Sequence, residues 1–104
     1  MTLTEIQTRL ETANIPVAYR FFPASSLPHV PFIVWYSTGD AFFYADNRNY
    51  KGFHMIAVEL YTAQKDEDVE RTLESILDDI APYTKYEAYI DTNECYQIRY
   101  EMEV

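Results

Sequence analysis

The sequence predicts an α+β fold, a two-layer sandwich in which two helices cover one face of a mainly antiparallel sheet. Three observations support this. Apolar residues recur at helical spacing near the N-terminus and again at about 66–80. Much of the remaining chain reads as strands, some of which alternate between apolar and polar residues. The 104 residues suffice for one domain, spanning 1–104, with the element order α-β-β-β-β-α-β-β.

The first helix is predicted close to the N-terminus, where Thr2 and Glu5 have the spacing of a capping box. Asn14 suits a left-handed residue at the end of a helix, and Pro16 prevents its continuation. Between these signals the apolar residues fall on one stripe, formed by Leu3, Ile6, Leu10 and Ala13. This stripe is the face that we expect to lie on the sheet.

Four strands are expected between the two helices, because runs of β-branched and aromatic residues are separated by turn residues. The runs are residues 17–22, 32–37, 41–45 and 50–62. A proline-rich connection follows the first run, and Thr38, Gly39 and Asp40 predict a turn between the second and the third. The run at 32–37 is strongly apolar, so we expect it to be covered on both faces.

The strand at 50–62 alternates between two sets of side chains. One face carries His54, Ile56, Val58 and Leu60, and the other carries Met55, Ala57, Glu59 and Tyr61. Two further strands, 86–91 and 95–104, are expected to end the chain after a turn around 92–94. The last of them also alternates, and the side chains expected to face inward are Tyr96, Ile98, Tyr100 and Met102.

The second helix, at about 66–80, has the clearest periodicity, with apolar residues at Val69, Leu73, Ile76, Leu77 and Ile80. Acidic residues crowd its first turn, where the helix dipole favours them. We expect this helix to be the main lid of the core, with both Leu73 and Ile76 buried. At its other end Asp78 and Asp79 oppose the dipole, so they are either candidates for contact with a basic partner or acids that the fold tolerates.

The net charge of −9 argues against a protein that binds the phosphate backbone of nucleic acid. Residues 1–51 are neutral overall, whereas residues 52–104 carry 13 acidic and 4 basic residues. This half is either a solvated acidic surface or one that faces a partner. Cys95 is the one cysteine, which excludes an intrachain disulfide and fits synthesis in a reducing cytoplasm. Neither a signal peptide nor a membrane span is expected.

The chain offers little for chemistry, and we assign no catalytic, cofactor-binding or metal-binding residues. His29, His54 and Cys95 stand singly, without a second ligand at metal-site spacing. Two glycines are too few for a phosphate-cradling loop. Asp46 and Glu59 could form the acid pair of a small metal-dependent nuclease, but Glu59 also fits the solvent side of a strand.

The segment from Asp40 to Gly52 reads DAFFYADNRNYKG, with aromatic residues followed by a polar tip and two bases. On a strand Phe42 and Tyr44 share one face, and Arg48 lies close by. Aromatic residues with a nearby arginine are typical of protein interfaces. The segment therefore predicts an interface hairpin. The candidate interface residues are Phe42, Tyr44, Asn47, Arg48, Tyr50, Lys51, Asp78 and Asp79.

Four segments resemble a known family: NIPVAYRFF, VPFIVWYSTGDAFFYADNRNY, VELYTAQKDEDVERTLESILDD and YEAYIDTNECYQIRYEMEV. Together they cover nearly the whole chain. In pattern they are similar to the tail-completion proteins of long-tailed, non-contractile bacteriophages and prophages, and above all to the tail terminators.

The resemblance implies a non-enzymatic virion protein at the head-proximal end of the tail, made in the cytoplasm of the host bacterium. It implies a hexameric ring of this chain, with the major tail tube protein and the head connector or neck protein as partners. It implies no cofactor, no sequence-specific nucleic acid and no membrane. A neck or head-completion protein of the same particle is the alternative, and a small nuclease is a third hypothesis.

Overall fold

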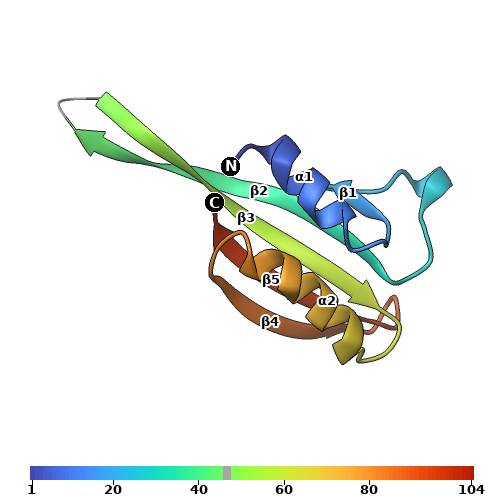
Figure 1. Ribbon diagram of the computed structural model, residues 1–104. Helices are drawn as coiled ribbons and strands as arrows, with labels where there is room; N and C mark the ends of the chain where they lie inside the picture. The colour runs from blue at the N-terminus through green and yellow to red at the C-terminus, as the bar shows by residue number, and fades with distance from the viewer. Residues whose placement is uncertain (46–47) are drawn as a thin grey trace.

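The computed structural model of the chain places helices α1 (Leu3–Glu11) and α2 (Glu67–Asp78) on one face of a five-stranded sheet (Figure 1). It describes the backbone of residues 1–45 and 48–104 and the side chains of residues 1–42 and 52–104. The expected fold class, an α+β two-layer sandwich with both helices on one face of a mainly antiparallel sheet, is confirmed.

The strands lie in the order β1-β2-β3-β5-β4. The short β1 (Val17–Tyr19) runs parallel to β2 (Phe32–Ala45). The other neighbours are antiparallel: β2 with β3 (Arg48–Thr62), β3 with β5 (Cys95–Glu103), and β5 with β4 (Tyr83–Ile90). The long β3 is therefore the central strand, and it pairs with a neighbour on each side.

The turn expected at residues 38–40 is instead an irregularity within one continuous strand, β2. The pairing register with β3 shifts between Ser37 and Gly39, which leaves Thr38 as an extra residue. The Thr38 hydroxyl donates a hydrogen bond to the carbonyl oxygen of Met55 at 3.1 Å. Such a bulge absorbs one residue without ending the ladder, which is why the turn-like sequence does not reverse the chain.

The strands at the two sheet edges also differ from the expected bounds. β1 stops at Tyr19, three residues early, because Arg20 adopts a positive φ of 71°. A 3-10 turn, η1 (Ala24–Ser26), interrupts the connection to β2. β4 begins at Tyr83, three residues before the expected start. These differences move strand ends and leave the layers unchanged.

The core lies between the helices and one face of the sheet, as the alternation in β3 and β5 predicts. Fully or nearly fully buried side chains from the strands are Ile33, Trp35, Ile56, Val58, Leu60, Ile98, Tyr100 and Met102. From the helices, the buried residues of this cluster are Ile6, Leu10, Leu73 and Leu77. The two large aromatic residues keep a polar partner: Trp35 Nε1 donates to Gln7 at 2.6 Å, and the Tyr100 hydroxyl donates to Glu74 at 2.6 Å.

The helix ends form as their residues predict. Thr2 and Glu5 make both hydrogen bonds of the capping box, and Asn14 has a φ of 62°. Asp66 caps α2 by accepting a hydrogen bond from the Val69 amide at 3.2 Å. Local sequence signals therefore set where each helix begins, and packing on the sheet sets how it lies.

The other face of β2 is partly covered, as expected for its apolar start. Val34 is only 9% exposed. The Phe22 ring, from the connection after β1, meets Phe32 edge-on with centroids 5.3 Å apart, and Phe32 stacks on Tyr61 at 5.1 Å. A row of three rings thus shields this end of the outer face of the sheet.

Leu73 and Ile76 were both expected to be buried, and for Ile76 this expectation is wrong, because Ile76 lies at the edge of the helix face that packs on the sheet. Leu73 is fully buried, whereas Ile76 is half-buried. Leu77, one position further, fills the core in its place.

We predict that Leu73→Ala lowers the free energy of unfolding by about 2–5 kcal/mol, because it leaves a cavity in a closely packed core. Ile76→Ala, the matched control, should cost less than about 2 kcal/mol because less of its side chain leaves water on folding. Urea unfolding followed by circular dichroism measures both. Equal losses for the two variants would contradict the burial described for α2.

Candidate interaction surface

The hairpin of β2 and β3 extends beyond the rest of the sheet (Figure 1). β1 pairs with β2 only as far as Trp35, and β5 pairs with β3 only from Met55. The end of β5 is fastened to His54 by two backbone hydrogen bonds with Val104, at 2.7 and 2.8 Å. Beyond that point, the described strand pairing of the hairpin is between β2 and β3 alone. The domain is consequently elongated, 51 Å along its longest axis.

Phe42 is the exposed aromatic residue described on this hairpin, with 55% of its surface accessible. It pairs across the strands with Gly52, and its ring lies against that glycine. A β-carbon at position 52 would lie only 2.7 Å from the ring atom Cε1 of Phe42. Glycine therefore lets the ring lie flat on the neighbouring strand, a known way to cover a strand glycine with an aromatic side chain.

Four more of the predicted interface residues lie in the strands of the hairpin. Tyr44 is near the end of β2, and Arg48, Tyr50 and Lys51 are in the first part of β3. Lys51 pairs with Phe43. Asn47 lies outside the described residues, as does Asp46. The predicted interface residues of the hairpin that the structure describes therefore all lie on one projecting element.

A side-chain hydrogen bond that the sequence did not predict lies at the base of the hairpin. Asp40 and His54 are partners in the register of β2 and β3, and Asp40 Oδ1 is 2.8 Å from His54 Nδ1. Both side chains are partly exposed. The two residues are 14 positions apart, so only knowledge of the strand register could have brought them together.

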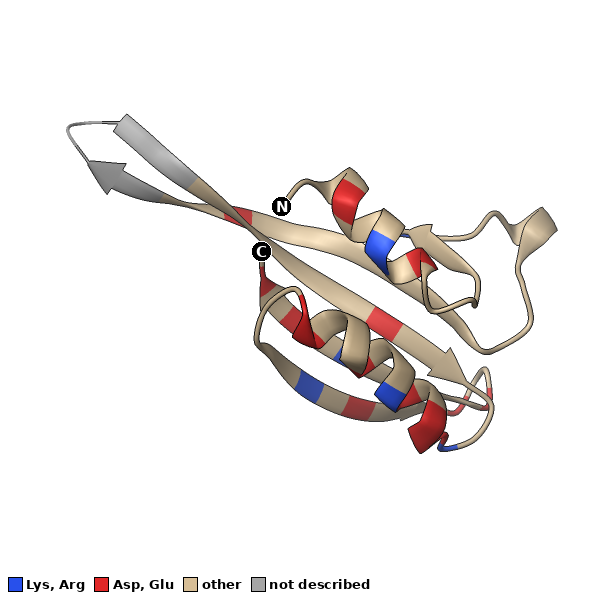
Figure 2. Ribbon diagram, viewed as in Figure 1, with Lys and Arg blue, Asp and Glu red and all other residues tan. Residues whose placement is uncertain are grey.

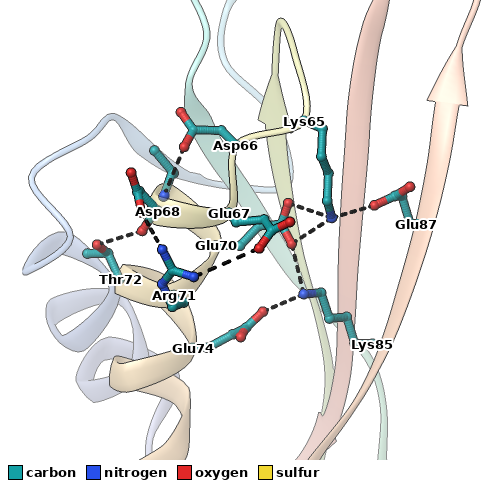
Figure 3. A network of polar contacts seen from close by, with 11 residues as sticks. Lys65, Asp66, Glu67, Asp68, Glu70, Arg71, Thr72, Glu74, Lys85 and Glu87 are labelled. Atoms are coloured by element: carbon teal, nitrogen blue, oxygen red, sulfur yellow. Dashed lines mark hydrogen bonds and ion pairs between the residues drawn. The ribbon is translucent and has the colours of Figure 1, made fainter.

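Figure 2 shows acidic residues distributed over α2 and the β4–β5 part of the sheet, with a few basic residues among them. Part of this charge forms a network under α2 (Figure 3). Glu70 is only 2% exposed, and it pairs with Lys65 and with Lys85, each at 2.8 Å. Lys85 also pairs with Glu74 at 2.7 Å, and Lys65 with Glu87 at 2.6 Å. The network ties α2 to the edge strand β4.

The charged side chains of this network shift one another's pKa values. Burial acts to raise the pKa of Glu70, but hydrogen bonds from Lys65 and Lys85 outweigh it, so the pKa is lowered. The hydrogen bonds to Glu70 and Glu87 raise the pKa of Lys65. Glu70 is therefore charged in the folded protein at neutral pH, although it is buried.

Asp78 and Asp79, the predicted interface acids outside the hairpin, are exposed at the C-terminal end of α2. Asp79 is the C-cap residue, and the last turn of α2 contains no basic residue. The pKa of Tyr83, at the start of β4, is raised by burial first and then by the negative charges of Glu74 and Asp78. This end of α2 lies toward the end of the domain from which the hairpin leaves (Figure 1).

A groove of about 670 Å³ lies where β3 leaves the sheet, and we call it the corner groove. The residues that line it include Thr38, Met55, Tyr83, Glu101, Met102 and Glu103. Met55 is 41% exposed, so the groove offers an accessible apolar surface. Glu101 and Glu103 are outward-facing residues of β5 at its rim; Glu101 pairs with Arg99 at 2.9 Å, so Glu103 supplies the net negative charge there.

Glu59 lies on the outer face of the sheet as expected, but it is only 8% exposed, so its expected solvent exposure is wrong. Tyr36 and Tyr61 each donate a hydrogen bond of 2.9 Å to its carboxylate and cover it. Burial, and then the charge of Glu59, raise the pKa of Tyr61 to about 12. Two tyrosines from neighbouring positions thus turn an outward-facing acid into a buried one.

The acid pair of the nuclease hypothesis falls partly outside the described residues, because Asp46 is one of the two that are not described. The start of β3 at Arg48 is separated from Glu59 by roughly 36 Å of extended strand. Among the described residues no group of three or more histidine, cysteine or acidic side chains could hold a metal ion.

No protein family matches the chain, and no curated protein is significantly similar to it. Within the described part of the chain, neither helix has the length and apolar character needed to cross a membrane.

We predict that Glu70→Gln lowers the free energy of unfolding at neutral pH by about 1–3 kcal/mol, because it removes charge-assisted hydrogen bonds beneath α2. A carboxylate with a lowered pKa stabilises the fold above its unfolded pKa, and this contribution is lost as the pH falls through the lower, folded pKa. The wild-type protein should therefore lose more stability between neutral and acidic pH than the variant.

Urea unfolding across that pH range measures the difference, and Glu67→Gln is a matched control because Glu67 is an exposed acid of the same helix turn. An identical pH dependence of wild type and Glu70→Gln would contradict the charged state assigned to Glu70.

Proposed function

We propose that this chain is a structural protein of a bacteriophage particle, which completes the tail by forming an oligomeric ring between the tail tube and the head. The observation that carries the proposal is the projecting hairpin with its exposed aromatic residue. The resemblance of the four sequence segments to tail terminators gives the proposal its particular form. The chain then acts by assembly and has no substrate.

The energetics of the hairpin favour a protein that works in an assembly. A two-stranded ribbon without further strands is marginally stable in water, and its open edges invite pairing with other chains. An exposed ring such as Phe42 adds apolar surface to that ribbon. Burial of the hairpin against a partner would remove both disadvantages, because it covers the ring and the strand edges together.

The charges favour contact between unlike surfaces. Arg48 and Lys51 are the two basic residues of the hairpin, whereas the C-terminal half has nine more acidic than basic residues. If the hairpin of one copy contacts the acidic half of the next, the contact is heterologous, and it closes into a ring when the rotation between copies closes. The tail tube and the head connector would then occupy the two sides of the ring.

We predict that Arg48→Glu combined with Tyr44→Ala leaves the domain folded but abolishes tail completion, because both changes fall on the hairpin and outside the core. Circular dichroism and cooperative melting check the fold. Function is measured by complementation of a phage from which the gene has been deleted, because the free protein need not assemble before it meets the tail.

The matched control is Arg9→Glu combined with Leu27→Ala, which also reverses one charge and truncates one exposed apolar side chain, away from the hairpin. The control should complement at the wild-type level. Complementation at that level by the folded hairpin variant would contradict the proposed role of the hairpin.

A further inference from the structure

We propose that the corner groove of one copy receives the hairpin of a second copy of this chain, with Phe42 on its apolar floor and the hairpin bases at its acidic rim. The inference rests on the proposed function and specifies which surface of the next copy the hairpin would contact. It follows from the chemistry of the two surfaces and from their arrangement in one copy.

The groove has the properties that an aromatic anchor requires. Its volume of about 670 Å³ is within the range of pockets that enclose small molecules, so it can accept an aromatic side chain. Met55, which is 41% exposed, contributes a flexible, polarisable side chain, which adapts to the shape of a ring. Tyr83 offers a further aromatic surface in the same groove.

The rim of the groove complements the hairpin in charge. Glu103 has no ion-pair partner among the described side chains, and the negative charge of Asp78 acts on Tyr83, which lines the groove. On the hairpin, the strand from Arg48 to His54 contains two bases and no acid. Asp40, on the facing strand, is already paired with His54. Opposite charges at the rim of an interface favour the encounter and set its orientation.

A copy cannot place its own Phe42 in its own groove. Phe42 pairs with Gly52, which lies three residues beyond Met55 on the same strand. Residues three apart on a strand lie roughly 10 Å apart. The paired strands hold the ring against Gly52, at that distance from Met55, so the contact has to form between copies. It joins two different surfaces, and repetition of such a contact generates a ring when the rotation between copies closes.

Disulfide trapping between two singly substituted proteins tests this contact. In a Cys95→Ala background, one protein carries Lys51→Cys on the hairpin and the other carries Glu103→Cys at the groove rim. We expect a disulfide-linked dimer when the two proteins are mixed at high concentration, and little dimer with either protein alone. Addition of Phe42→Ser to the hairpin protein should cause loss of most of the mixed dimer, because it removes the anchor.

The matched control replaces the rim cysteine by Thr8→Cys, an exposed position on α1. Two results would overturn the assignment of the groove. One is as much dimer with Thr8→Cys as with Glu103→Cys, and the other is the absence of mixed dimer although both proteins melt cooperatively. The same trapping in purified particles separates the two proposals. If the particles complement but contain no cross-link, the groove contact is refuted and the proposed function stands. If the cross-link forms but the protein is dispensable for tail completion, the proposed function is refuted and the groove contact stands.

Discussion

The structure depends on the alternation of β3, the central strand of the sheet, which pairs with β2 on one side and β5 on the other. Its even-numbered residues from Ile56 to Leu60 face the helices and are buried, while their neighbours face outward. A slip of one residue in the register with β2 or β5 would move all of these side chains to the wrong face. Since both helices pack on this one face, the position of every other element follows from the register of β3.

The acidic residues in the second half of the chain fall into two groups. Some of the acids are structural, because Glu70, Glu74 and Glu87 hold the lysines that join α2 to β4. A buried carboxylate is costly unless it is paired, and Glu70 is paired twice. The remaining acids, such as Glu103 and Asp79, take part in no ion pair that the structure describes. Only this second group is free to form a surface for a partner.

The hairpin is attached to the domain at its base, and Phe42, just beyond that base, is exposed. Two backbone hydrogen bonds between His54 and Val104 fasten it to the domain, and a side-chain hydrogen bond between Asp40 and His54 joins its two strands at the same level. Phe42 lies beyond that point, against Gly52. An element that is attached at its base but extends past its own core suits contact with another molecule, because Phe42 presents apolar surface that the domain itself leaves exposed.

Local signals in the sequence were sufficient for the helices and for the faces of the strands. The capping box at Thr2, the cap at Asp66 and the alternation along β5 depend on residues a few positions apart, so they could be read before any tertiary contact was known. The prediction of a projecting aromatic hairpin also came from one continuous segment. Its outer residues Asn47 and Asp46 lie outside the described structure.

Tertiary structure alone decided the features that depend on which strands are neighbours. The bulge at Thr38 replaced a predicted turn because pairing with β3 continued on both sides of it. Glu59 became buried because Tyr36 and Tyr61 close over it, and Ile76 became half-buried because of how α2 lies on the sheet. The corner groove combines residues from β2, β3, β4 and β5. Such contacts join residues far apart in the chain, and composition and periodicity carry no information about which distant residues meet.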